Sequence, residues 1–283
     1  MEEDDIMNFF SPAEVAKNYI ATGKSKVNLS ISKMLILSIL AGAFIGFGGV
    51  GCTTVAVSIP YASLGKFIGA CIFPGGLTMV LIAGSELFTG NCLLTIPLLE
   101  KEIKFSGMIR NWVFVYIGNL IGGLLVGAGV AFSHQPSLFN NGMAVSVIST
   151  AVAKTSMTFP DAFIRGILCN FLVCIAVWIS FAAKDVVSKI VGLFFPIMMF
   201  VLCGFEHSIA DMYFVSAGLF AKTIPAFANA AAEAGIDMSG LTWGTFFGKN
   251  LLPVTLGNIV GGAICVGCAY WFVYLRKAKK NAE

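Results

Sequence analysis

Charge is what this sequence has least of. Only 12% of its 283 residues are Asp, Glu, Lys or Arg, whereas soluble domains devote about 25% of their residues to these types. The shortage excludes soluble enzymes, nucleic-acid-binding proteins and disordered chains. The net charge of +3 is too small to imply a polyanionic partner. Because 57% of the residues are hydrophobic and the mean hydropathy is +0.87, the composition predicts an integral membrane protein whose solvent is the lipid bilayer.

Metal ligands are scarce as well. His134 and His207 are the two histidines, and the eight cysteines lie in or beside apolar runs, which is typical of small buried residues. Cys265 and Cys268 form a C-x-x-C motif, but no second pair or nearby histidine completes a metal site. We therefore expect no metal, no cofactor and no enzymatic activity. A haem-anchoring subunit of a redox enzyme, the remote alternative, needs paired axial ligands within the membrane, which the two histidines do not provide.

The chain has long apolar runs instead. A membrane-spanning helix needs about 20 mostly apolar residues. The stretches that satisfy this are 34–58, 67–99, 111–133, 161–182, 190–221 and 250–274. The second and fifth are too long for one simple span, and they contain the polar interruptions AGSELFTGN (83–91) and LCGFEHSIADM (202–212). We predict an all-α polytopic membrane protein with six transmembrane helices, in which helices 2 and 5 are broken and the segments 134–160 and 222–249 are outer loops.

The distribution of lysine and arginine predicts the orientation, because these residues accumulate on the cytoplasmic side of a membrane. If both termini lie in the cytoplasm, most of the eighteen cationic residues fall inside, Arg165 falls within a span, and the outside segments hold only Lys66, Lys154, Lys222 and Lys249. This asymmetry predicts cytoplasmic N- and C-termini and supports an even number of spans.

The N-terminal segment 8–25 predicts a helix of its own. Ser11-Pro12-Ala13-Glu14 is a capping box with proline at the first helical position, and apolar residues follow it at helical spacing. We expect an amphipathic helix that lies on the cytoplasmic membrane face. It serves either as a simple surface anchor or as a gate, and the sequence leaves both readings open.

An internal repeat organises the chain. Gly118-Asn119-Leu120-Ile121-Gly122-Gly123 in the third span recurs as Gly257-Asn258-Ile259-Val260-Gly261-Gly262 in the sixth, with a small-xxx-small face suited to close helix contact. The interruptions also match, since Gly84-Ser85-Glu86-Leu87 aligns with Gly204-Phe205-Glu206-His207. Repeat one (34–133) and repeat two (161–274) form a single channel domain (1–283). Three spans per half make the repeats inverted, and paired interruptions predict a permeation site near the midplane.

The acidic residues at the interruptions, Glu86 and Glu206, stand at membrane depth, where a charge is costly. Each precedes the second half of a broken helix, where a carboxylate can accept hydrogen bonds from unpaired N–H groups. We favour this structural role, in which they support the breaks together with Gly84 and Gly204. Direct binding of substrate is the alternative.

His207 is the histidine expected at membrane depth, in a break opposite Thr89. A buried imidazole without a role is possible, but the setting favours a pore role, in which His207 donates to an anion or exchanges a proton with it and Thr89 donates a hydroxyl hydrogen bond. The half-helices starting near Gly90 and Ser208 aim positive N-termini at the midplane, which favours an anion. Apolar constrictions are expected on either side, formed by Phe73, Leu77, Leu87 and Phe200.

Four further polar positions stay open between two roles each. Lys154, just before the fourth span, either attracts anions to the outer mouth or is an ordinary interfacial lysine. Asn119, Asn170 and Asn258 are either interhelical ties or pore-lining residues.

Several of these motifs together resemble one family, the formate/nitrite transporters, over essentially the whole length. The landmarks are SPAE (11–14), ELFTGN (86–91), GNLIGG (118–123), Lys154, GILCNFLVC (166–174), GFEHSIADM (204–212) and PVTLGNIVGG (253–262). The resemblance implies an aquaporin-like fold, a homopentamer with one pore per protomer, and transport of small monovalent anions across a bacterial plasma membrane. It also implies an omega loop at 87–89, a central histidine at His207, a vestibule lysine at Lys154, and polar vestibule residues at Asn170 and Asn258.

Within the family, the chain looks most similar to the hydrosulfide channels. Gly90-Asn91 follows the omega-loop threonine where formate channels usually carry small hydroxyl residues, and Pro74-Gly75 stands beside the first constriction. Hydrosulfide is therefore the expected substrate. Formate and nitrite are the alternatives, as is proton-coupled transport of the same anions.

Overall fold

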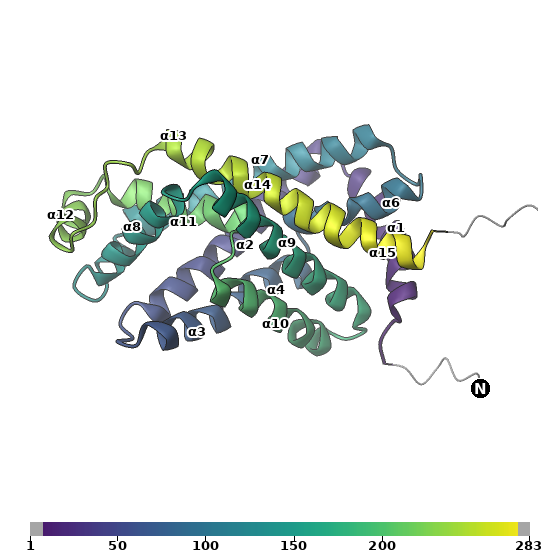
Figure 1. Ribbon diagram of the computed structural model, residues 1–283, viewed down its shortest axis with the longest axis horizontal. Coiled ribbons are helices and arrows are strands. Elements are labelled where there is room, and N and C mark those ends of the chain that lie inside the picture. Colours follow the sequence, from purple (N-terminus) through teal and green to yellow (C-terminus); the bar gives the residue numbers. More distant parts are fainter. Residues whose placement is uncertain (1–7, 277–283) are drawn as a thin grey trace, which may run out of the picture.

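The regular secondary structure is helical throughout the described chain. The structure, a computed structural model, describes residues 8–276, and beyond helices this range contains only one isolated bridge, between Phe9 and Ala183 (Figure 1). Six stretches of this range are long and apolar enough to cross a membrane: α2 (Ile31–Ala56), α3 with α4 (Ala62–Ile72 and Pro74–Ile82), α7 (Phe105–Phe132), α9 (Phe159–Ala182), α10 (Val186–Cys203) and Trp243–Tyr274. The predicted all-α, six-span fold is confirmed.

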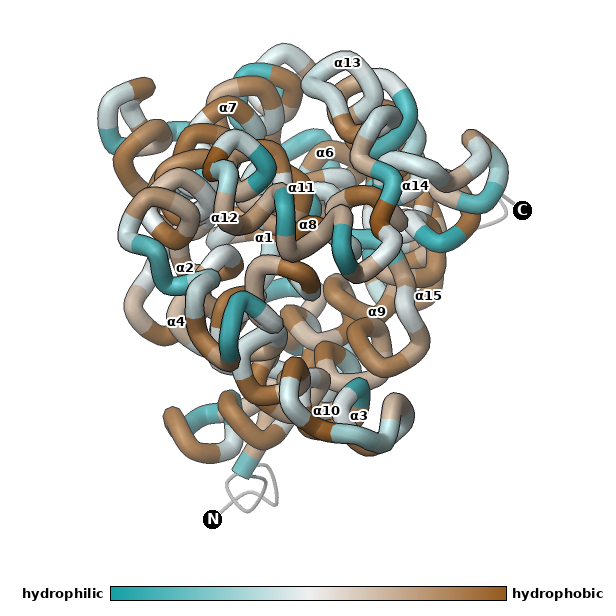
Figure 2. Tube along the Cα trace, turned by 90° about the vertical axis from the view of Figure 1, so that its left-hand side faces the viewer, coloured by the Kyte–Doolittle hydropathy of each residue, from teal (hydrophilic) through white to brown (hydrophobic). Residues whose placement is uncertain are grey.

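Large apolar side chains face outward from these spans. On α10, Val187 is 70% exposed and Phe195 57% exposed, and Leu125 on α7 is 60% exposed. Hydrophobic residues accordingly colour much of the periphery in Figure 2. A water-soluble monomer rarely exposes apolar patches of this extent, so the outer surface is suited to lipid or to neighbouring membrane helices.

The last span is one continuous helix with a varying pitch. Two π-helical segments, Phe246–Leu251 and Val260–Cys268, join α13 (Trp243–Thr245), α14 (Leu252–Ile259) and α15 (Ala269–Tyr274). Within the second segment, a Cβ at Gly262 would lie 2.8 Å from Sγ of Cys174 and would run into the amide of Asn170. Glycine is therefore required where this span passes α9.

The helices pack closely where the repeated glycines lie. α2 and α7 run side by side, and a Cβ at Gly122 would run into the carbonyl oxygen of Ile39 and lie 2.7 Å from the nitrogen of Ala43. Backbones this close gain packing that larger side chains would prevent. The predicted small-xxx-small contact is confirmed.

Both predicted breaks are present. α4 ends before Gly84, which has φ +81°, and α10 ends before Gly204, which has φ +69°. These positive φ angles favour glycine and turn the chain sharply out of the helix. After each break a short helical segment begins, namely α5 (Phe88–Asn91) continuing through Cys92–Leu94 into α6 (Thr95–Leu99), and α11 (Ser208–Ala221).

The predicted outer loops are corrected, because each contains a helix. Residues 134–160 include α8 (Gly142–Thr155), and residues 222–249 include α12 (Pro225–Glu233). α8 is too short to span a bilayer. It folds instead against α11, with buried apolar residues such as Val147, Ile148 and Ala151 on its inner face.

The N-terminal helix forms as predicted, but its apolar face has a different partner. α1 (Pro12–Val27) begins with the capping box, and hydrogen bonds from Ser11 hold the pKa of Glu14 below its usual value. Val15, Ala16 and Tyr19 are buried. They are covered because α1 packs against α6, α7, α9 and α15, at the end of the molecule opposite α8 and α12 (Figure 1). The helix therefore packs on the protein and is not a simple membrane-surface anchor.

Candidate functional site: two cavities and a buried threonine–histidine pair

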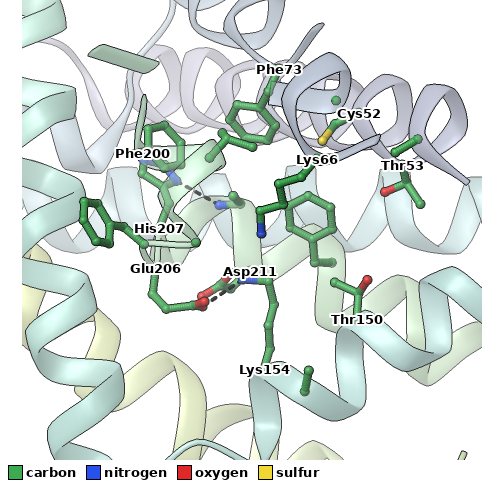
Figure 3. A pocket seen from close by; sticks show the side chains of 18 of the residues that line it. Cys52, Thr53, Lys66, Phe73, Thr150, Lys154, Phe200, Glu206, His207 and Asp211 are labelled. Atoms are coloured by element: carbon green, nitrogen blue, oxygen red, sulfur yellow. Dashed lines mark hydrogen bonds and ion pairs between the residues drawn. The ribbon is translucent and has the colours of Figure 1, made fainter. Parts of the chain in front are cut away.

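Two cavities enter the molecule toward the breaks. The Lys154 cavity, about 440 Å³, is lined by α2 near Cys52 and by the second break, and Figure 3 shows its side chains. The Lys26 cavity, about 380 Å³, is lined by α1, by α2 near Leu37 and by the first break. The two share no lining residue. Leu37 and Cys52 are fifteen residues apart on one helix, about 22 Å at 1.5 Å per residue, so the cavities approach from opposite ends.

The four predicted constriction residues lie at the inner ends of these cavities. Phe73 and Phe200 line the Lys154 cavity, and their rings meet edge to face with centroids 5.5 Å apart. Leu77 and Leu87 line the Lys26 cavity. All four are nearly fully buried, so apolar side chains close both cavities toward the centre.

Thr89 and His207 meet between the two breaks, as predicted. Oγ1 of Thr89 lies 2.9 Å from Nε2 of His207, and both side chains are buried. Nδ1 of His207 accepts the backbone N–H of Ala210 at 3.0 Å, which caps α11. An accepting Nδ1 carries no proton, so in the neutral ring Nε2 holds the proton and donates it to Thr89. The hydroxyl hydrogen of Thr89 is then available to another acceptor.

Two asparagines hold the half-helices in place. Oδ1 of Asn119 accepts the N–H of Phe88, and Oδ1 of Asn258 accepts the N–H of Ser208, both at 2.9 Å. The same amides donate to the carbonyl oxygens of Glu86 and Glu206, at 2.9 and 3.0 Å. Each asparagine therefore satisfies backbone groups that the break has freed.

The predicted role of the two glutamates is corrected by these contacts. Their carboxylates do not cap the half-helices, because the asparagines do. Oε1 of Glu86 lies 2.7 Å from Nζ of Lys26, and Oε2 of Glu206 lies 2.8 Å from Nζ of Lys154. Both glutamates are more than 90% buried, and a buried carboxylate requires a cationic partner.

Lys154 is also placed differently from the prediction. It lies in the last turn of α8, where its ammonium contacts Glu206 and Asp211 and reaches 2.7 Å from Oδ1 of the latter. Its side chain is 15% exposed, to the Lys154 cavity. It is therefore neither a free mouth lysine nor an ordinary interfacial one.

Asn170 and Asn258, predicted along the substrate pathway, line neither cavity. The amide of Asn170 donates to the carbonyl oxygens of Thr89 and Asn258, at 3.2 and 2.7 Å. Of the two roles left open, the structure favours the interhelical tie, because their polar atoms are used inside the protein.

Sequence reasoning missed a matched set of polar residues. In the first half, Asn91 donates to Glu86 and to Asn111, and Asn111 donates to the backbone oxygen of Lys26. In the second half the corresponding residues meet with one donor reversed: Asn250 donates to Asp211, and it also donates to the backbone oxygen of Lys154.

The matched contacts extend beyond the predicted repeat boundaries. They include Lys26 and Lys154, which precede residues 34 and 161. A signal was present in the sequence, because Asn91 and Asp211 each follow the aligned glutamate by five residues. Residues 8–276 hold no group of three His, Cys, Asp or Glu residues that could bind a metal ion.

The fold and the site together define a class. A polytopic membrane protein in which two cavities approach a buried hydrogen-bonding pair, with paired helix breaks around it, is organised as a channel or transporter. A family model described as "Formate/nitrite transporter" matches residues 13–272. The chain belongs to the formate/nitrite transporter family.

Its relatives include curated proteins over nearly the full length. The chain is 39% identical to a "Probable formate transporter" of Methanothermobacter thermautotrophicus, over 95% of this chain and 99% of that protein. It is 35% identical to the formate channel FocA of Escherichia coli strain K12, over 98% and 99%. These relatives are transporters and channels and not enzymes.

Solved structures share the fold. A pentameric formate channel with formate bound matches with a TM-score of 0.77 at 34% identity, covering 87% of this chain and 98% of that one. An FNT family ion channel matches with a TM-score of 0.79 at 28% identity, covering 92% and 98%.

Proposed function

We propose that this protein is a pore-forming membrane channel for small monovalent anions or their conjugate acids. The observation that carries the proposal is the Thr89–His207 pair between two cavities. Its available hydroxyl hydrogen needs an acceptor, and a small anion supplies one. The N-termini of α5 and α11 begin beside the pair and favour negative charge at the same place.

We infer the path from the placement of charge. The Lys154 cavity is the extracellular entrance and the Lys26 cavity the cytoplasmic one, in agreement with the excess of lysine and arginine on the Lys26 side. At each entrance a lysine ammonium lines the cavity beside its glutamate partner, where it can donate a hydrogen bond to an anion. Beyond the lysines, Phe73 with Phe200 and Leu77 with Leu87 exclude hydrated ions and admit a compact, dehydrated one.

His207 acts as a neutral hydrogen-bond donor in this proposal. Protonation of Nδ1 would remove the acceptor that caps the N–H of Ala210, and an unpaired buried N–H costs about 1–3 kcal/mol. The cap therefore opposes a histidinium at rest. Loss of the Nε2 proton would leave an imidazolate anion, so His207 does not hand this proton to the permeating anion. Passive permeation needs no proton transfer, and proton-coupled transport requires the anion to take its proton from water in a cavity.

Formate is the first substrate we propose. The two curated relatives described above are named for formate, and a solved relative holds formate. Part of the argument for hydrosulfide is weakened, since Asn91 donates to Glu86 and Asn111 and the carbonyl of Gly90 accepts from Tyr19. Although Gly90 and Asn91 line the Lys26 cavity, these polar groups are engaged in internal contacts. Hydrosulfide, which Pro74-Gly75 still favours, stays the second candidate, and nitrite the third.

We also propose a homopentamer in the bacterial plasma membrane. The support is a pentameric relative of the same fold, together with apolar helix faces such as that of α10, which lipid or a neighbouring copy can cover. Each protomer contains both cavities and both breaks within itself. One pore per protomer is therefore expected.

The test is anion flux in proteoliposomes that contain the purified protein. Uptake of formate, hydrosulfide and nitrite is measured at equal concentrations, with and without a pH gradient, beside protein-free vesicles. The proposal expects saturable uptake of at least one anion, with formate fastest. Uptake no faster than in protein-free vesicles for all three anions would refute it. Flux that follows the imposed proton gradient would favour coupled transport over a passive channel, and hydrosulfide flux exceeding formate flux would reverse the substrate order.

A further inference from the structure

The polar clusters of the two halves match in every member except one. In the first half, the amide of Asn91 donates a 2.7 Å hydrogen bond to Oε2 of Glu86. Asp211 occupies the corresponding place beside Glu206, five residues further along the chain, as Asn91 does beside Glu86. An amide always has hydrogen atoms to donate, whereas a carboxyl group has one only when protonated. The second half keeps the first half's pattern only if Asp211 carries a proton.

The charges of the cluster also favour a protonated Asp211. The ammonium of Lys154 lies 2.8 Å from Glu206 and 2.7 Å from Asp211 (Figure 3). The two carboxylates thus share one cation, and the Asp211 side chain is fully buried. With both ionised, the cluster would hold an uncompensated buried negative charge, which is costly. In the first half the balance is kept, because Asn91 is neutral and Lys26 faces one carboxylate.

We propose that Asp211 is a proton-binding site that controls the charge of the Lys154 cavity. With the proton bound, the cluster of Lys154, Glu206 and Asp211 is neutral overall, and Asp211 donates to Glu206. Loss of the proton to water in the cavity converts the carboxyl group into a carboxylate and leaves a net charge of minus one. Because that charge repels anions at their entrance, the proton on Asp211 promotes anion capture. This role in capture rests on the proposed function.

Asp211 holds the proton and Glu206 the charge because of their surroundings. Glu206 is 6% exposed at the cavity wall, whereas Asp211 has no exposure and, among residues 8–276, accepts one further hydrogen bond, from Asn250 at 3.2 Å. Asp211 also lies in the first turn of α11, whose dipole favours an anion. Glu206 lies beside the same helix end, and the dipole does not change the cluster's count of two carboxylates against one ammonium.

The neighbouring elements offer no second cation in contact with Asp211 within the described residues. Lys154 of α8 is the cation that pairs with it. The remaining titratable or charged groups that act on the cluster or line its cavity are Glu206 and His207 of the break, Tyr116 of α7, Cys169 and Arg165 of α9, Lys66 of α3 and Cys52 of α2.

Infrared difference spectroscopy of the full-length protein in lipid nanodiscs tests for the proton itself. The carbonyl stretch of a protonated carboxyl group is distinct from the bands of a carboxylate. We expect this signal in the parent protein at neutral pH, its loss in Asp211→Asn, and no loss in the exposed control Asp237→Asn. The mirror variant Asn91→Asp places a second carboxyl group beside Glu86 and should gain the signal. An unchanged signal in Asp211→Asn would overturn the proton site.

Measurements of anion uptake test whether the proton on Asp211 promotes anion capture. In the parent protein, the formate concentration that gives half-maximal uptake should rise with pH, by up to tenfold per pH unit above the transition, because one proton is lost. In Asp211→Asn the rise attributable to this site should vanish. The same pH dependence in both proteins would overturn the role in capture. If the parent protein moves no anion at all, the proposed function fails, while the infrared result still decides whether Asp211 binds a proton.

Discussion

At the scale of single residues, the hydrogen bonds at the centre of this protein determine which donor is still available to a substrate. The backbone of Ala210 takes one nitrogen of His207, the other donates to Thr89, and the Thr89 carbonyl accepts from Asn170 and Cys174. The hydroxyl hydrogen of Thr89 is what remains. Such a donor, lying between two cavities, discriminates by the size and basicity of the acceptor that reaches it.

Removing that hydroxyl should reduce transport without unfolding the protein. Thr89→Val keeps the shape of the side chain and the cap on α11. Hydrogen bonds to charged groups contribute about 1.5–3 kcal/mol, so we expect anion flux in proteoliposomes to fall at least about tenfold.

Thr53→Val is the matched control for Thr89→Val. Thr53 lines the Lys154 cavity, but its hydroxyl donates to the carbonyl oxygen of Gly49 in its own helix. Its flux should stay within about twofold of the parent. Equal losses in the two variants would show that the Thr89 hydroxyl has no special role.

At the scale of elements, the half-helices depend on residues outside themselves. α5 is only four residues long and has no side-chain cap of its own. The amide of Asn119, carried by the long helix α7, bonds the N–H of Phe88 and the carbonyl oxygens of Ser38 and Glu86. One side chain thus ties two spans to the loop between them.

Substitution of this tie should destabilise the protein strongly. Asn119→Ala leaves the buried N–H of Phe88 and the carbonyl oxygen of Glu86 without this partner, at about 1–3 kcal/mol each, so we expect a loss of about 2 kcal/mol or more. The temperature of half-unfolding in detergent reports it. Asn18→Ala, on the exposed face of α1, is the control and should shift the temperature little. A shift in Asn119→Ala no larger than in this control would contradict the role of the tie.

Much of the element pattern could be predicted, and the failures share a cause. The spans, both breaks and the capping box follow from hydropathy, the repeated motifs and local hydrogen bonding within a few residues. α8 could not be predicted, because a helix of fourteen residues with a moderately apolar face resembles a loop until α11 is known to cover it. The partners of Glu86 and Glu206 were missed for the same reason: Lys26 and Lys154 lie 60 and 52 residues away.

At the scale of the whole molecule, charge asymmetry predicts the orientation. α2 and α7 run in the same direction, since Gly118 packs on Leu35 and Gly46 on Val126. Ser32, at the start of α2, and Ser137, just beyond the end of α7, therefore lie on opposite sides of the membrane. The positive-inside rule places Ser32 in the cytoplasm.

Thiol labelling of intact cells tests this orientation. A membrane-impermeant maleimide should label Ser137→Cys above the level of the unsubstituted protein, whose native cysteines set the background. Ser32→Cys should be labelled only after the cells are permeabilised. The reverse pattern would invert the orientation and exchange the two entrances proposed above.

The sequence by itself determined the lipid solvent, the number of spans, the two breaks and the pairing of Thr89 with His207. Hydropathy and glycine act over a few neighbouring residues, and the internal repeat can be recognised by comparing the two halves of the chain. Only the tertiary structure decided the partner of each buried charge. Asn258 caps a half-helix, Glu206 pairs with Lys154, and Asp211 joins them. Distance and geometry in the folded protein determine these partners. An unpaired polar group is costly in the low-dielectric interior, and here the groups that pair with it come from other elements.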